Sequence, residues 1–442
     1  DISEEFDTPV LLRLSTRISH SRSAVVFSER IQRELKPYEK NIGKNVMMPA
    51  MAKAAHKKVE ERISKLTDWA DMKAFELGIN KKIMFDRKIG VIAAGSTYEY
   101  AREALGDKAS YLKLGMVNPL PVKAILDFAK EVETLYVIEE LDDIIETHCI
   151  KLGVNVIGKE KFSFLGEFSQ SIKKAVLGTE NEYSSLDMEI PPRPPVLCAG
   201  CPHRGLFYAL KKFKPYVSGD IGCYTLGAQA PLSMVDSCIC MGASLSSLHG
   251  FNIARGKEQA KKSVAVIGDS TFIHSGITGL IDIAYNKGFS TVIILDNSIT
   301  GMTGHQNNPA NGLTIKGDPT VAVNLEALAH AIGINRVKVV DPFDIEETRR
   351  VIDEELKVEE PSLIISRRPC ALLKNVKHKP AMVVERDACT GCKACLQVGC
   401  PAIMQTKAEN GKTKAFIDSN QCLGCEVCAA SCRFNAIRKG GN

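Results

Sequence analysis

The segment SVAVIGDSTFIHSGITGLIDIAYNKGFSTVIILDNS, residues 263–298, contains the pattern that decides the fold class. Its ends, VAVIGDS and STVIILDN, each contain an apolar run with the length and β-branched content of a buried strand. Between them, SGITGLIDIAYNKG predicts a helix that carries four apolar residues on one side: Ile277, Leu280, Ile281 and Ala284. A strand, a helix and a second strand in this order predict a parallel α/β sheet with a right-handed crossover.

The same segment predicts a cation site where its two strands end. Asp269 follows the first strand and Asn297 follows the second. The carboxyl ends of parallel strands form the edge at which open α/β sheets bind ligands. Carboxylate and amide oxygens suit Mg²⁺, which takes few protein ligands and completes its shell with phosphate oxygens. A dinucleotide-binding turn is the alternative, but GDS lacks the GxGxxG pattern that such a turn needs.

The C-terminal part of the chain is rich in cysteine. Eight of the fifteen cysteines lie between residues 389 and 442, in the two runs C-x2-C-x2-C-x4-C-P and C-x2-C-x2-C-x3-C. Three cysteines at this spacing wrap three thiolates around one iron–sulfur core, so each core needs a fourth ligand from elsewhere. Zinc knuckles pair their cysteines in twos, and a disulfide framework requires an oxidising compartment, so both alternatives are less favoured.

This cysteine-rich segment resembles a bacterial-type ferredoxin with two [4Fe-4S] clusters, in which each run supplies the fourth ligand of the other cluster. The resemblance implies one cluster on Cys389, Cys392, Cys395 and Cys432 and a second on Cys422, Cys425, Cys428 and Cys400. The x4 spacing, and Arg433 at a position where proline is common, depart from the ferredoxin pattern. Oxygen-labile clusters indicate a reducing interior, typical of an anaerobe.

The composition of the 442 residues is that of a globular chain of about three domains, with 45% apolar and 25% charged residues. No run approaches the roughly 18 apolar residues of a membrane helix, and the opening DISEEFDTPV lacks the features of a signal peptide. We therefore expect no membrane association and a cytoplasmic location. The formal net charge is +5, but negatively charged clusters would offset it, so no nucleic-acid partner is predicted.

The segment 263–298 is also similar to the signature of thiamine-diphosphate enzymes, in which GDG is followed, one helix and one strand later, by NN. Here GDS is followed by Asp296 and Asn297. The resemblance implies Mg²⁺ ligation by Asp269, Asn297 and the backbone carbonyl of Ile299. It further implies a group of cofactor-binding residues around the diphosphate: Gly268, Ser270 and Gly222, the last of these in SGDIGCYTLG.

Three further motifs, SGDIGCYTLG, CMGASLSSLHGFNIA and GMTGHQNNP, extend this likeness to thiamine-dependent 2-oxoacid oxidoreductases. That family binds an additional [4Fe-4S] cluster beside the thiazolium ring. The positions that match its four ligands are Cys198, Cys201, Cys223 and Cys370. The remaining cysteines match no ligand and are expected to be core residues: Cys149, Cys238 and Cys240.

Taken in order, the chain resembles the α subunits of indolepyruvate:ferredoxin oxidoreductases. The expected fold class is α/β, with parallel-sheet thiamine-diphosphate-binding and transketolase-C-like domains and a small α+β two-cluster ferredoxin domain. The expected domains are a tail of the pyrimidine-side thiamine domain at 1–45, a helical linker at 46–80, the transketolase-C-like domain at 81–180, the thiamine-diphosphate domain at 196–375 and the ferredoxin domain at 380–442. Most of the pyrimidine-side domain of that family, with its activating glutamate, has no match here, so we expect an N-terminally truncated chain.

The pattern predicts further elements within these domains. TPVLLRLST and AVVFSE read as strands at 8–16 and 24–29, and residues 52–78 read as a charged helix. The apolar stripe of this helix is Val59, Ile63, Leu66 and Ala70. IGVIAAGS, YLKLGM and LYVIEE read as buried strands, with helices at 97–106, 121–131 and 142–152, and PPRPP at 191–195 reads as a stiff linker.

The resemblance implies oxidative decarboxylation of arylpyruvates such as indolepyruvate. Thiamine diphosphate and Mg²⁺ would act on the 2-oxoacid, the clusters would carry electrons to an external ferredoxin, and coenzyme A would take the acyl group. A smaller β subunit and an α2β2-type assembly are expected partners. His203, His274 and His305 are candidate catalytic residues, although a lone histidine is more often an ordinary hydrogen-bonded residue.

Three alternatives to this function stay open. The chain could belong to another 2-oxoacid oxidoreductase, to a non-redox thiamine-dependent decarboxylase whose clusters are structural, or to an electron-transfer fragment without activity of its own. Reduction of a dye that depends on 2-oxoacid and coenzyme A would separate the redox enzyme from the other two.

Overall fold

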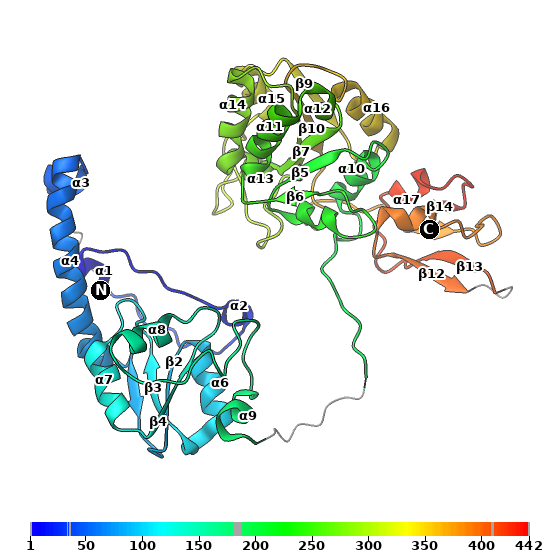
Figure 1. The fold of residues 1–442 in the computed structure, drawn as a ribbon. Coiled ribbons are helices and arrows are strands. Elements are labelled where there is room, and N and C mark those ends of the chain that lie inside the picture. Colours follow the sequence, from blue (N-terminus) through cyan, green and yellow to red (C-terminus); the bar gives the residue numbers. More distant parts are fainter. Residues whose placement is uncertain (1, 33, 35–36, 180–187, 408–410, 441–442) are drawn as a thin grey trace. The chain divides into compact units, whose positions relative to one another are not determined.

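The computed structural model describes residues 2–32, 34, 37–179, 188–407 and 411–440, and it divides between Glu189 and Ile190 into two compact units (Figure 1). Within these residues the first unit contains a four-stranded sheet, and the second contains a six-stranded sheet and two two-stranded sheets. None of the described helices combines the length and the apolar character needed to span a membrane.

The described residues before α4 include three short helices, α1 (Ile2–Phe6), α2 (Thr16–His20) and α3 (Ile42–Asn45). The predicted strands at 8–16 and 24–29 are wrong, because the described residues provide them with no partner strand. Leu11 and Val26 in these segments are 96% and 98% exposed. Apolar, β-branched content favours a strand only where a neighbouring strand supplies the hydrogen bonds.

The helix predicted over 52–78 is two helices, α4 (Pro49–Asp71) and α5 (Lys73–Glu76). Pro49 occupies the first turn of α4, where its missing N–H breaks no hydrogen bond of the helix. Only the C-terminal half of the predicted stripe is buried: Leu66 and Ala70 pack inside, whereas Val59 and Ile63 are exposed. The linker is therefore amphipathic only where it meets the domain that follows.

The sheet of the first unit has the order β1-β3-β2-β4, in which only β1 is antiparallel to its neighbour. Its strands are β1 (Lys81–Ile83), β2 (Ile89–Ala94), β3 (Ser110–Leu114) and β4 (Thr134–Ile138). The helices of this domain are α6 (Ser96–Leu105), α7 (Val122–Lys130), α8 (Ile144–Lys151) and α9 (Ile172–Leu177). The predicted strand–helix alternation is confirmed, and Cys149 on α8 is buried in the core as expected.

The second unit is built on a six-stranded parallel sheet of order β6-β5-β7-β8-β10-β9. Its strands are β5 (Tyr216–Gly219), β6 (Ser237–Cys238), β7 (Ser263–Gly268), β8 (Thr291–Asp296), β9 (Arg336–Val340) and β10 (Ser362–Arg367). The helices are α10 (Pro202–Leu210), α11 (Ala243–Arg255), α12 (Lys257–Ala260), α13 (Asp269–Thr271), α14 (Ile277–Tyr285), α15 (Leu325–Ile332) and α16 (Ile345–Glu355). The segment 263–298 thus supplies the two central strands of the sheet.

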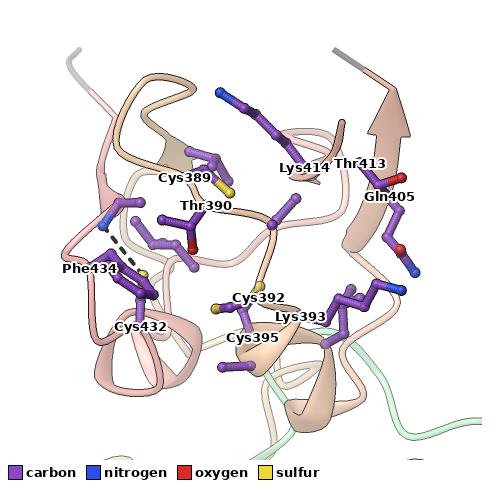
Figure 2. Close-up of a pocket in the computed structure, with 17 residues that line it drawn as sticks. Cys389, Thr390, Cys392, Lys393, Cys395, Gln405, Thr413, Lys414, Cys432 and Phe434 are labelled. Carbon is purple, nitrogen blue, oxygen red and sulfur yellow. Dashed lines mark hydrogen bonds between the residues drawn. The ribbon is translucent and has the colours of Figure 1, made fainter. Parts of the chain in front are cut away.

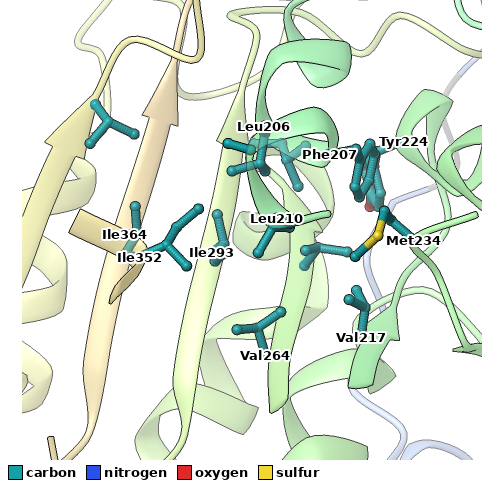
Figure 3. Close-up of a cluster of buried hydrophobic side chains, with 14 of the residues drawn as sticks. Leu206, Phe207, Leu210, Val217, Tyr224, Met234, Val264, Ile293, Ile352 and Ile364 are labelled. Carbon is teal, nitrogen blue, oxygen red and sulfur yellow. The ribbon is translucent and has the colours of Figure 1, made fainter. Parts of the chain in front are cut away.

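Both faces of this sheet are buried under helices, which is why its strands are apolar throughout. Val264 and Ile293 belong to the cluster on one face, where they pack with Leu206 and Leu210 of α10 (Figure 3). The neighbouring strand residues Ala265 and Val292 belong to the cluster on the other face, with residues of α11, α14 and α15. Successive residues of a strand point to opposite faces, so one strand serves two cores.

The buried face of α14 differs from the predicted one. Leu280 is buried as expected, but Ile281 is 47% exposed and Ile283 takes the place on the inner face. Gly279 explains the difference: a methyl group at this position would lie 3.0 Å from the Cβ of Leu245, so the glycine lets α14 approach α11 closely. An apolar stripe cannot reveal a packing face that is centred on a glycine.

The C-terminal residues of the second unit form two small antiparallel sheets, β11 with β14 and β12 with β13. Their strands are β11 (Met382–Val384), β12 (Ile403–Lys407), β13 (Thr413–Ile417) and β14 (Ile437–Lys439). A short 3₁₀ helix, Ala394–Val398, and α17 (Val427–Ala430) lie between the strands. This α+β segment belongs to the same compact unit as the six-stranded sheet.

Candidate active site and cluster sites

The predicted cation ligands meet at the carboxyl ends of β7 and β8. These strands are neighbours, with Gly268 opposite Leu295, so the residues that follow them come together. Asp269 and Asn297 are 2% and 7% exposed. One terminal atom of the Asn297 amide lies 3.2 Å from Asp269 Oδ1 and 2.7 Å from the Ile299 carbonyl oxygen. Ser298 has a left-handed φ of 60°, which turns the chain between Asn297 and Ile299.

The two possible orientations of the Asn297 amide bear on whether this arrangement suits a cation. With its nitrogen inward, the amide donates hydrogen bonds to Asp269 Oδ1 and the Ile299 carbonyl. With its oxygen inward, the amide oxygen faces the two other oxygens, an arrangement that a bound cation would stabilise. The donor set is thus a carboxylate, an amide and a carbonyl oxygen, which fits Mg²⁺.

Asp269 is held by a residue that the sequence analysis did not single out. Asn308 Nδ2 donates to Asp269 Oδ2 at 3.0 Å, and Asn308 is itself buried. Burial raises the pKa of Asp269 to about 7, and the nearby charge of Asp296 acts in the same direction. A buried carboxylate with a raised pKa lacks a compensating charge, which a bound cation would supply. Asn308 lies in GMTGHQNNP, but nothing in that motif indicates which side chain reaches Asp269.

Asp296 precedes Asn297 but has a different partner. Arg367 Nε donates to Asp296 Oδ2 at 2.7 Å, and the same guanidinium pairs with Glu326 at 2.7 Å. The hydrogen bonds and charges of these two carboxylates raise the pKa of Arg367. The Asp296 charge is therefore balanced by the protein itself, which leaves Asn297 as the residue of the pair that faces Asp269.

The glycines predicted to face the cofactor lie against one aromatic ring. A methyl group at Gly268 would stand 2.7 Å from Tyr224 Cε1, and one at Gly222 would stand 2.3 Å from the same atom. The Tyr224 hydroxyl donates to the Ile221 carbonyl at 2.9 Å, which fixes the ring. Ser270 accepts a hydrogen bond from Thr300 at 2.9 Å, and this ties the first loop to the second.

Two of the four cysteines expected beside the thiamine site, Cys370 and Cys223, lie next to the loop that follows β8. The Cys370 amide donates to the Asn297 carbonyl at 2.9 Å. A methyl group at Gly301 would lie 3.5 Å from Cys223 Sγ and 3.8 Å from Asn297 Nδ2. Cys198 is close enough for its charge to raise the pKa of three other thiols, those of Cys201, Cys223 and Cys370, after the larger effect of burial.

The cysteines of the C-terminal segment line two cavities. One cavity, of about 440 Å³ with open solvent included, is lined by the four sulfurs of Cys389, Cys392, Cys395 and Cys432 (Figure 2). The other, of about 430 Å³, is lined by Cys400, Cys422, Cys425 and Cys428. Each cavity also receives a backbone N–H on a sulfur, from Ala436 to Cys432 at 3.4 Å and from Met382 to Cys422 at 3.3 Å.

Among the described residues, no three His, Cys, Asp or Glu side chains are close enough to hold a single metal ion. A zinc ion would draw its thiolates to about 2.3 Å from one centre. A four-iron core takes four cysteine ligands, and each of the two cavities is lined by the four cysteines of one group.

The three candidate histidines have different environments. His203 is buried with its ring edge-on to Tyr224, at 5.8 Å between centroids, and burial lowers its pKa to about 4. His305 Nε2 lies 3.9 Å from Cys370 Sγ. His274 is exposed in a π turn, Phe272–Gly276, a feature that often occurs at functional sites. The structure thus brings His305 against the candidate ligand Cys370 and His203 against Tyr224, the ring next to Gly268 and Gly222.

Two cysteine expectations are wrong. Cys238 and Cys240 were expected in the core, but both are exposed. Cys238 ends β6, the short strand at the edge of the sheet, and Cys240 lies in the loop that follows it. At an edge strand, the sequence alone does not reveal whether a cysteine is buried or exposed.

Comparison with known proteins agrees with the geometry of this site. Residues 220–366 match the family model of the thiamine pyrophosphate enzyme, C-terminal TPP binding domain. The chain is 36% identical to proteins named indolepyruvate oxidoreductase subunit IorA from Pyrococcus horikoshii and Thermococcus kodakarensis, over 99% of this chain and 74% of each relative. A relative of the same name from Archaeoglobus fulgidus is 34% identical, over 99% of this chain and 73% of its own length.

A solved structure with partial likeness is a 2-oxoglutarate:ferredoxin oxidoreductase from Magnetococcus marinus, with a TM-score of 0.36 and 18% identity over 42% of this chain and 68% of that one. The fold of residues 220–366 is that of the C-terminal TPP-binding domain of thiamine pyrophosphate enzymes. More narrowly, the chain belongs to the family of the indolepyruvate oxidoreductase subunit IorA.

Proposed function

We propose that this chain is the α subunit of a 2-oxoacid:ferredoxin oxidoreductase that acts on arylpyruvates such as indolepyruvate. The reaction consumes one 2-oxoacid, one coenzyme A and two oxidised ferredoxins. It yields one acyl-coenzyme A, one CO₂, one proton and two reduced ferredoxins. The name of the relatives, which calls them a subunit of an indolepyruvate oxidoreductase, supports the substrate class and a partner subunit. A smaller β subunit in an α2β2-type assembly is part of the proposal.

The observation that carries the proposal is the contact between a candidate cluster ligand and a candidate cation ligand. The Cys370 amide is bonded to the Asn297 carbonyl, so a cluster on the Cys198, Cys201, Cys223 and Cys370 group would lie beside the cation site. Asp269, Asn297 and the Ile299 carbonyl would hold Mg²⁺ and, through it, the diphosphate. When bound, thiamine diphosphate supplies an electron sink for the carbon that loses CO₂.

Two features of the chain support removal of electrons at this site. Burial lowers the pKa of His203 to about 4, so this residue carries no extra proton to donate at neutral pH. Cysteine-ligated clusters instead accept single electrons at low potential. Cys201 also lines the cavity of the Cys400, Cys422, Cys425 and Cys428 group, which supports a path onward to the C-terminal clusters.

The test is dye reduction by the chain produced anaerobically with its smaller subunit, thiamine diphosphate and Mg²⁺. We expect reduction only when both coenzyme A and an arylpyruvate are present, with indolepyruvate, phenylpyruvate and 4-hydroxyphenylpyruvate preferred over pyruvate and 2-oxoglutarate. Release of CO₂ without dye reduction would instead identify a decarboxylase. Binding of thiamine diphosphate without any turnover would identify an electron-transfer component.

Iron analysis with variants tests the cluster beside the thiamine site separately. The unaltered chain should bind about twelve irons if three four-iron clusters are present, and Cys370→Ser should lower this number and abolish turnover. Cys240→Ser is the matched control, because Cys240 is an exposed cysteine of the same unit outside the three cysteine groups. It should leave the iron content unchanged.

A further inference from the structure

Arg204 is a buried cation without a carboxylate partner in the described part of the chain. It lies on α10 and is 3% exposed. Its Nε donates to the Cys198 carbonyl at 3.0 Å, and its other nitrogens donate to the carbonyls of Leu197, Val398 and Gly399. These carbonyls come from two segments, one before α10 and one in the C-terminal cysteine-rich part. Arg204 therefore joins the two halves of the second unit.

Four carbonyl oxygens accept hydrogen bonds from the Arg204 guanidinium but do not balance its charge. A buried charge is costly unless an opposite charge lies nearby. Burial lowers the pKa of Arg204, and the charges that act against this effect are those of thiolates: Cys400, Cys201, Cys198 and Cys425. Two of these belong to the group beside the cation loop and two to the second C-terminal group.

The cavity of the second C-terminal group confirms this placement from another side. Arg204 and Cys201 line it together with the four cysteines of that group. A methyl group at Gly200, next to Cys201, would lie 3.1 Å from the Leu423 side chain, so the two segments approach each other closely here. The two cysteine groups therefore approach each other at Arg204. The largest charge effects on Arg204 come from these two groups, and none of them comes from a cysteine of the Cys389, Cys392, Cys395 and Cys432 group.

We infer that Arg204 is a positioning residue for electron transfer: its charge, placed between two cluster sites, raises the reduction potentials of both clusters together. The inference rests on the proposed function, which supplies the clusters. A cluster with four thiolate ligands is negatively charged and gains one further negative charge on reduction. A fixed positive charge nearby stabilises the reduced form most, so the potential rises.

The experiment is a redox titration of the complete, anaerobically prepared enzyme, followed by electron paramagnetic resonance. Arg204→Gln should lower the equilibrium constant for one-electron reduction of two of the three clusters by about tenfold or more. For one electron this is a fall of about 59 mV in the reduction potential. The cluster on the Cys389 group should keep its potential and serves as the internal reference. Arg204→Lys, which keeps the charge but loses the planar fork of donors, should retain potentials close to those of the unaltered enzyme.

Lys211→Gln is the matched control variant. Lys211 Nζ donates to the carbonyl of Pro231 and to Gln397 Oε1, so it joins the same two parts of the unit. Its pKa is lowered by burial alone, with no contribution from a cysteine. Loss of Lys211 should therefore leave all three potentials unchanged.

The outcomes separate this inference from the proposed function. If the unaltered enzyme contains no clusters, the proposed function fails before Arg204 is tested. If the clusters are present but Arg204→Gln leaves their potentials unchanged, or shifts only one of them, the inference about Arg204 is wrong. Equal shifts in Arg204→Gln and Arg204→Lys would likewise overturn it, as would a loss of iron that the lysine variant does not restore.

Discussion

At the scale of the residue, cation binding depends on one buried carboxylate. Burial raises the pKa of Asp269 to about 7 in the metal-free chain, well above the ordinary value of 3.8. The metal-free fold therefore loses stability as the pH rises from about 3.8 to about 7, because the folded state holds a proton that the unfolded state releases. A bound cation removes this cost, since it takes the place of the proton.

We therefore predict that Mg²⁺ and thiamine diphosphate bind more tightly as the pH rises towards 7. Below this pH the proton on Asp269 competes with the cation, so the apparent affinity should fall by roughly tenfold for each pH unit. Above about pH 7 the affinity should level off. Calorimetric titrations between about pH 5.5 and 8.5 would measure the profile.

Asn308→Ala provides the variant for this profile. The hydrogen bond from Asn308 favours the ionised form of Asp269, so its loss should move the midpoint to higher pH. Asn311→Ala, in the same loop but bonded to Asn307 at 3.0 Å, should leave the midpoint in place. An affinity that does not vary with pH in the unaltered chain would show that Asp269 does not bind the cation.

Asp269 and Asn297 could be predicted because the relevant information is local. Each follows a buried strand directly, and the parallel topology alone brings the two strand ends to one edge. Asn308 and Arg204 could not be predicted in the same way. Asn308 reaches Asp269 from a loop 39 positions away, and Arg204 bonds to Gly399 across 195 positions. No spacing in the sequence records such contacts.

At the scale of the element, the tight approach of the β7 loop to Tyr224 gives a second prediction. Gly268→Ala would place a methyl group 2.7 Å from Tyr224 Cε1, and the hydroxyl bond to Ile221 keeps the ring from moving away. We expect a loss of about 1–3 kcal/mol in unfolding free energy, together with weaker binding of thiamine diphosphate. Denaturant unfolding and ligand titration would measure the two effects.

The control for this glycine is Gly250→Ala on α11. A methyl group at Gly250 would meet nothing within 4 Å, and alanine is the better helix former. This variant should gain up to about 1 kcal/mol in stability and bind thiamine diphosphate normally. If Gly268→Ala were as stable as the unaltered chain, the ring would have more freedom than these contacts indicate.

The contact between β9 and α16 gives a third prediction, on stability alone. Glu355 is completely buried, and Arg336 donates to both of its carboxylate oxygens at 2.9 Å. Arg336→Met would leave this carboxylate without its charge partner, so we expect a loss of about 3–5 kcal/mol.

Arg350→Met, on the exposed side of α16, tests the same chemistry at the surface. Arg350 pairs with Glu347 and Glu354 on the same helix, and its side chain is largely exposed. The expected loss is about 0–1 kcal/mol. Thermal and denaturant unfolding of both variants would measure the difference, and similar losses in the two would mean that burial does not strengthen the Arg336 pair.

Helices and strands could be predicted from sequence where a strand is buried on both faces. The prediction failed where the structure of a segment depends on whether another element packs against it. The strands around Val266 and Ile293 are apolar throughout because helices cover both of their faces. The segment around Val26 is apolar in the same way, yet it has no partner strand in the described residues. Likewise, Gly279, rather than an apolar stripe, determines which face of α14 is buried.

At the scale of the whole molecule, all of the candidate chemistry lies in one of the two units. The cation loop and the three cysteine groups fall between Cys198 and Cys432. The hydrophobic clusters of the first unit contain no residue of the second, and the reverse also holds among the described residues. Each unit therefore has its own core, which is the requirement for folding alone.

From this separation we predict that a chain of residues 190–442 folds and binds as much iron as the full chain, about twelve per molecule. The cut falls before the exposed PPRPP stretch. In the full chain, calorimetry should resolve two unfolding transitions, and only one of them should respond to Mg²⁺ and thiamine diphosphate. A single transition, or a 190–442 chain that loses iron although it is expressed anaerobically, would show that the first unit contributes to the stability of the cluster sites.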